Sequence, residues 1–287
     1  MASLKEVKGR IASVNNTRKI TSAMKMVASA KLHKAQAAIE SMLPYERRLH
    51  HILTDFMSNC TEVTSPFIVK REVKKVAVVV FASNTSLCGG FNANVIRHLV
   101  DLLAEYKPLG LENILVFPVG KKVADAVRKL GFRIEGDFQH MADKPSYQEA
   151  ADLAADLMKR FLHGDVDKVE LLYNHFKSTA SQILTRETYL PIDLNNEKKE
   201  EERTIDYILE PSAEELMQEM LPKVLRMKMF TVLLDSNAAE HAARTMVMQI
   251  ATDNANELLQ ELTVMYNKSR QQSITNELLD IVGGSMA

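Results

Sequence analysis

Cysteine and aromatic residues are scarce in this sequence. Among 287 residues there is no tryptophan, aromatic residues make up 6%, and methionine occurs 15 times. So few aromatic side chains suit helical packing surfaces better than an aromatic-rich core. The two cysteines, Cys60 and Cys88, fit no CxxC or metal-ligand spacing. This argues against a disulfide framework or a zinc site and favours a reducing compartment.

A targeting or membrane-spanning segment is also missing. No apolar signal core stands near the N-terminus, and no arginine- and serine-rich, acid-poor extension precedes the first helical pattern. The longest strongly apolar run, residues 76–82, is shorter than the roughly 20 residues that cross a bilayer. We therefore expect a protein that is not itself embedded in a membrane.

Neither sign of charge dominates the whole chain. The formal net charge is −1, which argues against bulk binding to nucleic acid or acidic lipid. The charge is nevertheless uneven, with ten basic and three acidic residues in residues 1–50 and nine acidic and three basic residues in residues 197–219. Two interpretations stay open: a solvated helix and loop surface, or a basic rod that faces an acidic partner.

Glycine and proline, the strongest helix breakers, are absent between Pro222 and Gly283. The pattern predicts one very long helix over residues 211–284, with Pro211 at its first position and a local bend at Pro222. About 70 residues give a rod of roughly 100 Å. A compact domain of this length has a radius of about 19 Å. Such a rod needs a partner helix, another protein, or both.

Apolar residues at alternating spacings of three and four predict a second long helix, from residue 3 to about residue 56, in which Pro44 kinks the helix or ends its straight part. The same heptad pattern occurs near both ends of the chain, which favours an antiparallel coiled coil of the first and last helices. The two expected seams are Leu4, Val7, Ile11, Val14, Ala28, Leu32, Ala35, Ile39 and Met42, and then His241, Thr245, Met248, Thr252, Ala255, Leu259, Leu262 and Tyr266.

The middle of the chain alternates strand and helix patterns, which is typical of an open α/β sheet. The fold class we predict is therefore α/β: long terminal helices in an antiparallel coiled coil plus a central Rossmann-like domain whose sheet is mostly parallel, with an antiparallel edge possible. Ser146 and Glu149 fit a capping box at the start of one helix. Expected strands cover residues 75–81, 113–119, 132–138, 168–176 and 182–190, and expected helices 93–106, 121–130 and 146–162. The expected domains are 1–58, 73–195 and 208–287.

Catalytic equipment is hard to find in this sequence. The turn at Leu87, Cys88, Gly89 and Gly90 follows a strand, but it lacks the GxGxxG fingerprint, and no GxxxxGK[ST] loop occurs. No His or Asp is placed to activate Cys88 as a nucleophile, and no HExxH motif occurs. We therefore expect no catalytic residue, cofactor or metal. A free-standing α/β enzyme with coiled-coil arms and a passive coiled-coil tether stay open as alternatives.

Several stretches carry a resemblance to a known family. The N-terminal run of residues 11–27 (IASVNNTRKITSAMKMV), the C-terminal runs of residues 240–246, 251–255 and 266–278, and the closing residues 281–284 resemble the γ subunit of F-type ATP synthases, bacterial type. The central turn, Leu87 to Asn92 (LCGGFN), is similar to that family's turn. The resemblance covers the whole length, and the two terminal motifs are highly specific.

The resemblance implies a non-catalytic central-stalk rotor that transmits torque in a proton- or sodium-driven ATP synthase. Its implied partners are the α and β subunits of the catalytic hexamer, the ε subunit and the membrane c-ring, without nucleic acid and with membrane contact only through those partners. The implied location is the cytoplasmic face of the bacterial inner membrane, as a peripheral subunit. Subunit-contact residues carried over by position are Met24, Lys25, Arg244, Arg270, Gln271, Thr275 and Glu277.

The sequence departs from the family pattern at Asn84, Thr85 and Ser86, where relatives usually have Asp-Arg-Gly before Leu-Cys-Gly-Gly. The change removes local charges and a flexible glycine, so a contact made by that turn is in question. The inserted cysteine pair of the light-regulated chloroplast form is also missing. Together with the missing transit peptide, this favours a bacterial enzyme or a processed organellar one.

Overall fold

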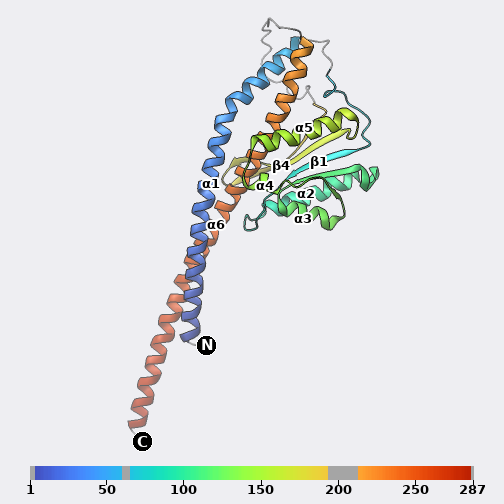
Figure 1. Cartoon of the computed structure of the whole chain (residues 1–287). Helices are drawn as coiled ribbons and strands as arrows, with labels where there is room; N and C mark the ends of the chain where they lie inside the picture. The colour runs from blue at the N-terminus through green and yellow to red at the C-terminus, as the bar shows by residue number, and fades with distance from the viewer. Residues whose placement is uncertain (1–3, 60–64, 193–212, 286–287) are drawn as a thin grey trace. The chain divides into compact units, whose positions relative to one another are not determined.

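The computed structural model describes residues 4–59, 65–192 and 213–285. The chain divides into two compact units, which are considered separately. The central unit comprises residues 30–243, and the terminal unit comprises residues 1–29 together with residues 244–287. Two long helices, α1 (Leu4–Asn59) and α6 (Ala213–Ser285), contribute residues to both units (Figure 1).

The helix-breaking prolines do not end either long helix. Pro44 lies inside α1 and Pro222 inside α6, so the prediction that the first helix continues past Pro44 is confirmed. A proline removes one backbone hydrogen bond, and the rest of a long, packed helix outweighs that local cost. The predicted helix start at Pro211 lies outside the described residues, as does Cys60.

The central sheet has five strands in the order β3-β2-β1-β4-β5. β1 is parallel to β2 and β4, β2 is parallel to β3, and only β5 is antiparallel, to β4. The predicted parallel sheet with an antiparallel edge is therefore confirmed. The strands are β1 (Val76–Phe81), β2 (Ile114–Val119), β3 (Arg133–Ile134), β4 (Lys168–Ser178) and β5 (Ser181–Leu190).

β3 is shorter than the expected strand over residues 132–138, because Gly136 takes a positive φ of 74° and turns the chain. The helices of the central unit are α2 (Phe91–Tyr106), α3 (Lys121–Leu130), α4 (Gln139–Asp143) and α5 (Tyr147–His163), with 3-10 turns η1 (Lys107–Leu109) and η2 (Leu111–Asn113). α2, α3 and α5 confirm the predicted helices, whereas α4 lies in a segment for which no helix is predicted.

The predicted capping box at the start of α5 is not formed. Ser146 is the N-cap residue, but no side-chain hydrogen bond caps the helix there. Glu149 instead places its carboxylate 3.1 Å from Nδ1 of His140 on α4. A tertiary contact has replaced the local one, and it connects α4 to α5.

Two apolar layers enclose the sheet of the central unit. Val76, Val78 and Val80 of β1 face α2 and α3, while Ala77, Val79 and Phe81 face the opposite side. That opposite layer is built from α4 and α5 and also from α6, between residues 217 and 234. Part of α6 therefore covers one face of the sheet of the α/β domain, and the helix continues beyond that part to Ser285.

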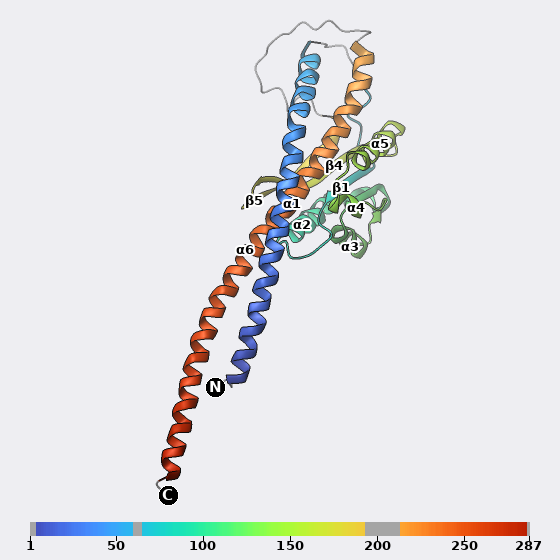
Figure 2. The same cartoon turned by 60° about the vertical axis from the view of Figure 1, so that its left-hand side comes forward.

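In the terminal unit, α1 and α6 run antiparallel. Thr21 lies against Thr252 and Arg18 against Asn256, so residue numbers rise along one helix as they fall along the other. The predicted seam is confirmed at its most buried members, which are Val7, Ala28, Met248, Ala255 and Leu262. Extending the same register places Leu4 opposite residues near 270. The rest of α6 continues past the described start of α1, as Figures 1 and 2 both show.

Candidate functional site

The first place to look for a ligand in this fold is the C-terminal edge of β1 and β4. The sheet order reverses there, and open α/β sheets hold their ligands at such a switch point. The turn that follows β1 is closed by its own hydrogen bonds. Asn92 accepts from the Ser83 backbone N–H at 3.0 Å and donates to the Ser83 hydroxyl at 2.7 Å and to Cys88 Sγ at 3.2 Å.

In this protein α6 fills the switch point. Cys88 and Phe91 pack against Ala239 and Ala243 of α6, with Phe176 of β4 beside them. Because alanine has the smallest side chain after glycine, the helix backbone comes close to the turn. Cys88 is 2% exposed and serves as packing and as a hydrogen-bond acceptor. The turn holds a helix where related folds hold a small molecule.

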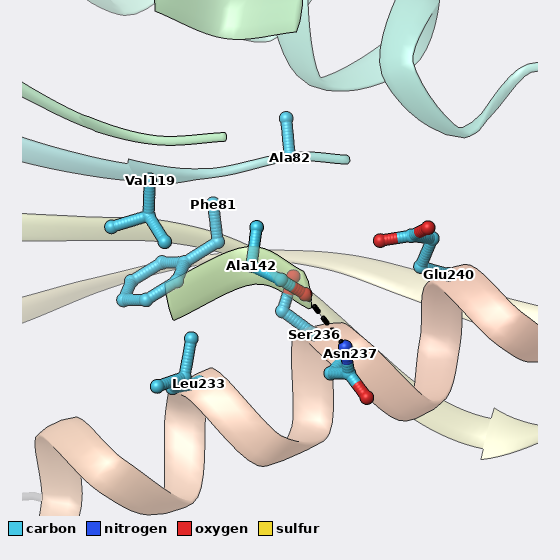
Figure 3. Close-up of a pocket in the computed structure, with 8 residues that line it drawn as sticks. All are labelled: Phe81, Ala82, Val119, Ala142, Leu233, Ser236, Asn237 and Glu240. Atoms are coloured by element: carbon cyan, nitrogen blue, oxygen red, sulfur yellow. Dashed lines mark hydrogen bonds between the residues drawn. The ribbon is translucent and has the colours of Figure 1, made fainter. Parts of the chain in front are cut away.

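A small cavity remains beside this contact (Figure 3). It measures about 10 Å³, which is about the space of one water molecule. Asn237 of α6 donates from Nδ2 to the carbonyl of Ala142 on α4 at 2.8 Å and closes one side. The cavity is far smaller than the several hundred Å³ of a typical small-molecule site.

The departure from the family pattern at residue 84 has a structural role. Asn84 accepts from the backbone N–H of Lys121, the first residue of α3, at 2.8 Å, and it donates to the carbonyl of Gln139, the first residue of α4, at 2.8 Å. Helix N-termini carry unpaired N–H groups, so this side chain supplies one partner and joins two helices.

Polar contacts also hold the β4–β5 hairpin to α6. Tyr189 donates its hydroxyl to the carbonyl of Leu225 at 2.8 Å, and Lys228 pairs with Glu187 at 2.9 Å. Burial raises the pKa of the Tyr189 phenol above its ordinary value, so the group stays a neutral donor. A third contact, through Asp235, joins α6 to β4. Together these contacts attach the α/β domain to one face of the last helix.

The residues expected to touch partner subunits lie in the terminal unit, in two kinds of environment. Met24 and Lys25 are partly buried on α1, and Arg244 is 9% exposed and engaged within the chain. The other four are exposed on the part of α6 beyond the described start of α1: Arg270, Gln271, Thr275 and Glu277. Thr275 donates its hydroxyl to the carbonyl of Gln271, a bond within the helix.

The same part of α6 exposes a dense set of apolar side chains. Ile274, Leu278, Leu279, Ile281 and Val282 are 49–68% exposed. Thirteen of the twenty-three large hydrophobic residues found exposed in the described chain belong to the terminal unit, which holds about a quarter of the residues. Contiguous exposed apolar surface marks an interaction site.

The sequence reasoning missed the residues that join the domain to α6. Asp235 and Asn237 stand in an ordinary helical stretch, and Asn84 was noted only as a departure. The sequence offers only a weak signal for them. Asp and Asn have low helix propensity and do not belong to an apolar helix face, so neither property explains why they occur inside this helix. Among the described residues, no three His, Cys, Asp or Glu side chains gather in a way that could hold a metal ion.

A family model described as ATP synthase matches residues 3–287. The chain is 82% identical to an ATP synthase gamma chain of Phocaeicola vulgatus and 64% identical to one of Bacteroides fragilis, each over the full length of both proteins. The chain belongs to the ATP synthase gamma chain family. It is accordingly a central-stalk rotor subunit and has no catalytic role of its own.

Solved structures agree on the fold. The chain resembles one from the Euglena gracilis mitochondrial ATP synthase, OSCP/F1/c-ring in rotational state 3, with a TM-score of 0.64 and 20% identity over 99% of this chain and 93% of that one. It also resembles one from the Tetrahymena thermophila mitochondrial ATP synthase central stalk and c-ring, with a TM-score of 0.58 and 22% identity over 81% and 99%. None of the described helices has the length and hydropathy of a membrane span.

Proposed function

We propose that this gamma chain transmits torque between a membrane c-ring and the nucleotide sites of a catalytic hexamer of α and β subunits. The observation that carries the proposal is the exposed apolar surface of the terminal unit, including the last turns of α6. Water disfavours such a surface, so a surrounding sleeve of partner subunits would bury it.

The mechanism we propose depends on unequal contacts. An asymmetric helix pair presents a different face to each of several equivalent β subunits. A conformational equilibrium shifts only if the two conformations bind the shaft with different free energies. Rotation of the shaft would therefore exchange the nucleotide affinities among the β subunits. The coupling ion is a proton or sodium.

The attachment of the α/β domain to α6 supports a second part of the proposal. In our assignment the domain (residues 73–195) meets the c-ring and the ε subunit, and the terminal helices (residues 1–58 and 208–287) meet the α and β subunits. Two hydrogen bonds attach the domain directly to α6, one from Tyr189 of the domain to Leu225 of α6 and one from Asn237 of α6 to Ala142 of the domain. We place the subunit at the cytoplasmic face of the bacterial inner membrane.

Individual residues receive roles in this proposal. Met24 and Lys25 would face an acidic segment of a β subunit, where the basic character of the N-terminal helix suits the partner. Arg244 would hold its place in the helix pair close to that contact. Four further residues would contact β-subunit loops near the end of α6, namely Arg270, Gln271, Thr275 and Glu277, because their side chains are exposed.

Two rival functions predict different results. A free-standing α/β enzyme would turn over or tightly bind a small ligand as a purified chain, which the filled switch point disfavours. A passive tether would keep normal coupling after substitution of its exposed residues. The rotor proposal expects an inert isolated chain and impaired coupling in the complex.

The decisive experiment is co-purification followed by activity measurement. We expect the tagged chain to elute with α- and β-type subunits whose ATPase activity depends on it. The double variant Arg270→Ala, Gln271→Ala should lower ATP-driven ion pumping per ATP hydrolysed by about fivefold, the lower end of typical coupling between sites. The control Glu219→Ala removes an exposed carboxylate on the same helix that pairs with Lys223, and it should behave as wild type. Equal coupling in all three proteins would refute the proposal.

A further inference from the structure

The β4–β5 hairpin extends beyond the sheet that it belongs to. β4 pairs with β1 only as far as Leu172, whereas its pairing with β5 continues to Ser178. Residues 173–178 therefore have a strand neighbour on one side alone. A two-stranded ribbon is marginally stable by itself, and an unpaired strand edge leaves backbone groups without partners.

Asp235 of α6 supplies the missing partner at this edge. Its Oδ1 accepts from the backbone N–H of Phe176 at 2.8 Å, and its Oδ2 lies 2.6 Å from Nδ1 of His175. One carboxylate thus contacts two successive residues of β4. Hydrogen bonds to an ionised acceptor are shorter and stronger than neutral ones. The Asp235 side chain is 14% exposed, so water competes little for these contacts.

The neighbouring side chain reinforces the position. Phe176 packs against two apolar clusters that include alanines of α6; the first contains Leu32, Ala35, Ala238 and Ala242, and the second contains Cys88, Phe91, Ala239 and Ala243. Apolar packing is non-directional. The carboxylate adds a directional contact one turn earlier on the same helix.

The other contacts between hairpin and helix lie nearer the base of the hairpin. Glu187 and Tyr189 belong to the part of β5 opposite the segment of β4 that also pairs with β1. Their contacts with Lys228 and Leu225 hold a segment that the sheet already supports. The outer half of the hairpin, which reaches α6 in Figure 2, is held there by the Asp235 carboxylate and by the packing of Phe176.

We propose that Asp235 is a positioning residue that makes the β4–β5 hairpin and α6 turn as one body under load. The inference rests on the proposed rotor function. The apolar core between residues 217 and 234 holds the body of the α/β domain on α6, whereas the outer hairpin beyond that core is held by the packing of Phe176 and by the Asp235 carboxylate. Without the carboxylate, part of each rotation would be lost as movement of the outer hairpin against α6.

The test uses the assembled complex in inverted membrane vesicles and measures ATP hydrolysis and ATP-driven ion pumping side by side. We expect Asp235→Ala to lower the ions pumped per ATP by about fivefold while hydrolysis stays near wild type. Asp235→Asn keeps an acceptor for Phe176 N–H and should retain most of the ratio. Glu219→Ala, which removes a carboxylate whose ion pair stays within α6, is the matched control.

His175→Ala is the second variant, because His175 is about half exposed and its removal does not threaten folding. It deletes one of the two contacts and should lower the ratio, but by less than Asp235→Ala does. The inference is overturned if both Asp235→Ala and His175→Ala match the control. It is equally overturned if pumping and hydrolysis fall in proportion, or if Asp235→Asn falls as far as Asp235→Ala. Failure of the rotor function itself would appear in the wild type, as hydrolysis and pumping independent of this chain.

Discussion

The hydroxyl oxygens of Thr21 and Thr252 lie 2.9 Å apart across the helix pair of the terminal unit. Each is also within hydrogen-bond distance of its own helix, Thr21 at 3.0 Å from the carbonyl of Arg18 and Thr252 at 2.7 Å from that of Met248. Two hydroxyl hydrogens cannot serve three contacts at once. One threonine must donate its hydroxyl hydrogen to the other threonine, and it then cannot donate to the carbonyl in its own helix. The pair therefore joins the two helices at the expense of one hydrogen bond within a helix.

A double-mutant cycle with valine tests this pairing. Thr21→Val and Thr252→Val should each destabilise the chain by roughly 0.5–1 kcal/mol, the net value of one hydrogen bond. The double variant should cost no more than either single one, because it loses the same bond once and gains an apolar contact. The measurement is denaturant unfolding of the full chain. Thr21→Val combined with Thr263→Val, an exposed threonine bonded to its own helix, should be additive. Additivity in the seam pair would contradict the expectation.

A second prediction concerns the buried carboxylate of Glu170. It accepts from Tyr106 at 2.8 Å, Lys168 at 2.5 Å and Arg186 at 3.0 Å, and it is 2% exposed. Burial alone raises the pKa of Glu170, but the hydrogen bonds from Arg186, Lys168 and Tyr106 outweigh it, and its pKa is lowered from 4.5. The cluster joins the end of α2 to β4 and β5.

The sign of the pH dependence follows from that lowered pKa. The unfolded chain binds a proton at Glu170 more readily than the folded one, so the stabilisation is present above pH 4.5 and is lost as the pH falls below it. Glu170→Gln should cost about 2 kcal/mol at neutral pH, as for a hydrogen-bonded charge, and flatten the loss of stability in acid. Unfolding midpoints measured between neutral and acidic pH check both points. Glu72→Gln, at an exposed ion pair, should leave the profile unchanged.

Gly120 and Gly131 form a matched pair for a third prediction. Both have a positive φ, 113° and 77°, but a Cβ at Gly120 would lie 2.2 Å from the carbonyl oxygen of Ala82, whereas one at Gly131 meets nothing within 4 Å. Gly131→Ala should cost about 1–2 kcal/mol for left-handed strain alone. Gly120→Ala should cost about 3 kcal/mol or more, because the end of β1 must move as well. Thermal unfolding of the two variants should rank them in this order, and equal costs would contradict it.

The sequence predicted what depends on local pattern. The unbroken apolar run that forms β1 identified a buried parallel strand, and the alternation of three and four placed Val7, Ala28 and Leu262 in a helix seam. The first signal is a short β-branched apolar run and the second is a periodicity, and both can be found in the local sequence without knowledge of the rest of the fold. The terminal motifs added the family, which periodicity could not.

What the sequence did not predict depends on tertiary placement. Nothing local indicates that α6 would cover one face of the sheet, or that Ala239 and Ala243 would fill the ligand position beside Cys88. In the sequence, Asp235 cannot be distinguished from other acidic residues on a helix surface. Its contact with β4 follows from the structure, in which β4 extends beyond its pairing with β1. The failed capping box has the same cause, because His140 offers Glu149 a partner from a neighbouring element.

The exposed leucines near the end of α6 carry the last prediction. Leu278 and Leu279 are 57% and 63% exposed, whereas Leu262 is 6% exposed in the helix seam. In the isolated chain Leu278→Ala and Leu279→Ala should each change the free energy of unfolding by less than about 0.5 kcal/mol. Leu262→Ala should cost about 2 kcal/mol or more, because it empties a packed site.

In the assembled complex a cost should also appear at the end of α6. If a sleeve of partner subunits buries Leu278 and Leu279, the double alanine variant loses apolar contact that exists only there, and coupled ion pumping should fall although the isolated chain is unchanged. Unfolding of the free chain and pumping by vesicles measure the two sides of this comparison. A double variant that loses stability in isolation would mean that these side chains pack within the chain. One that pumps normally would mean that no partner covers them.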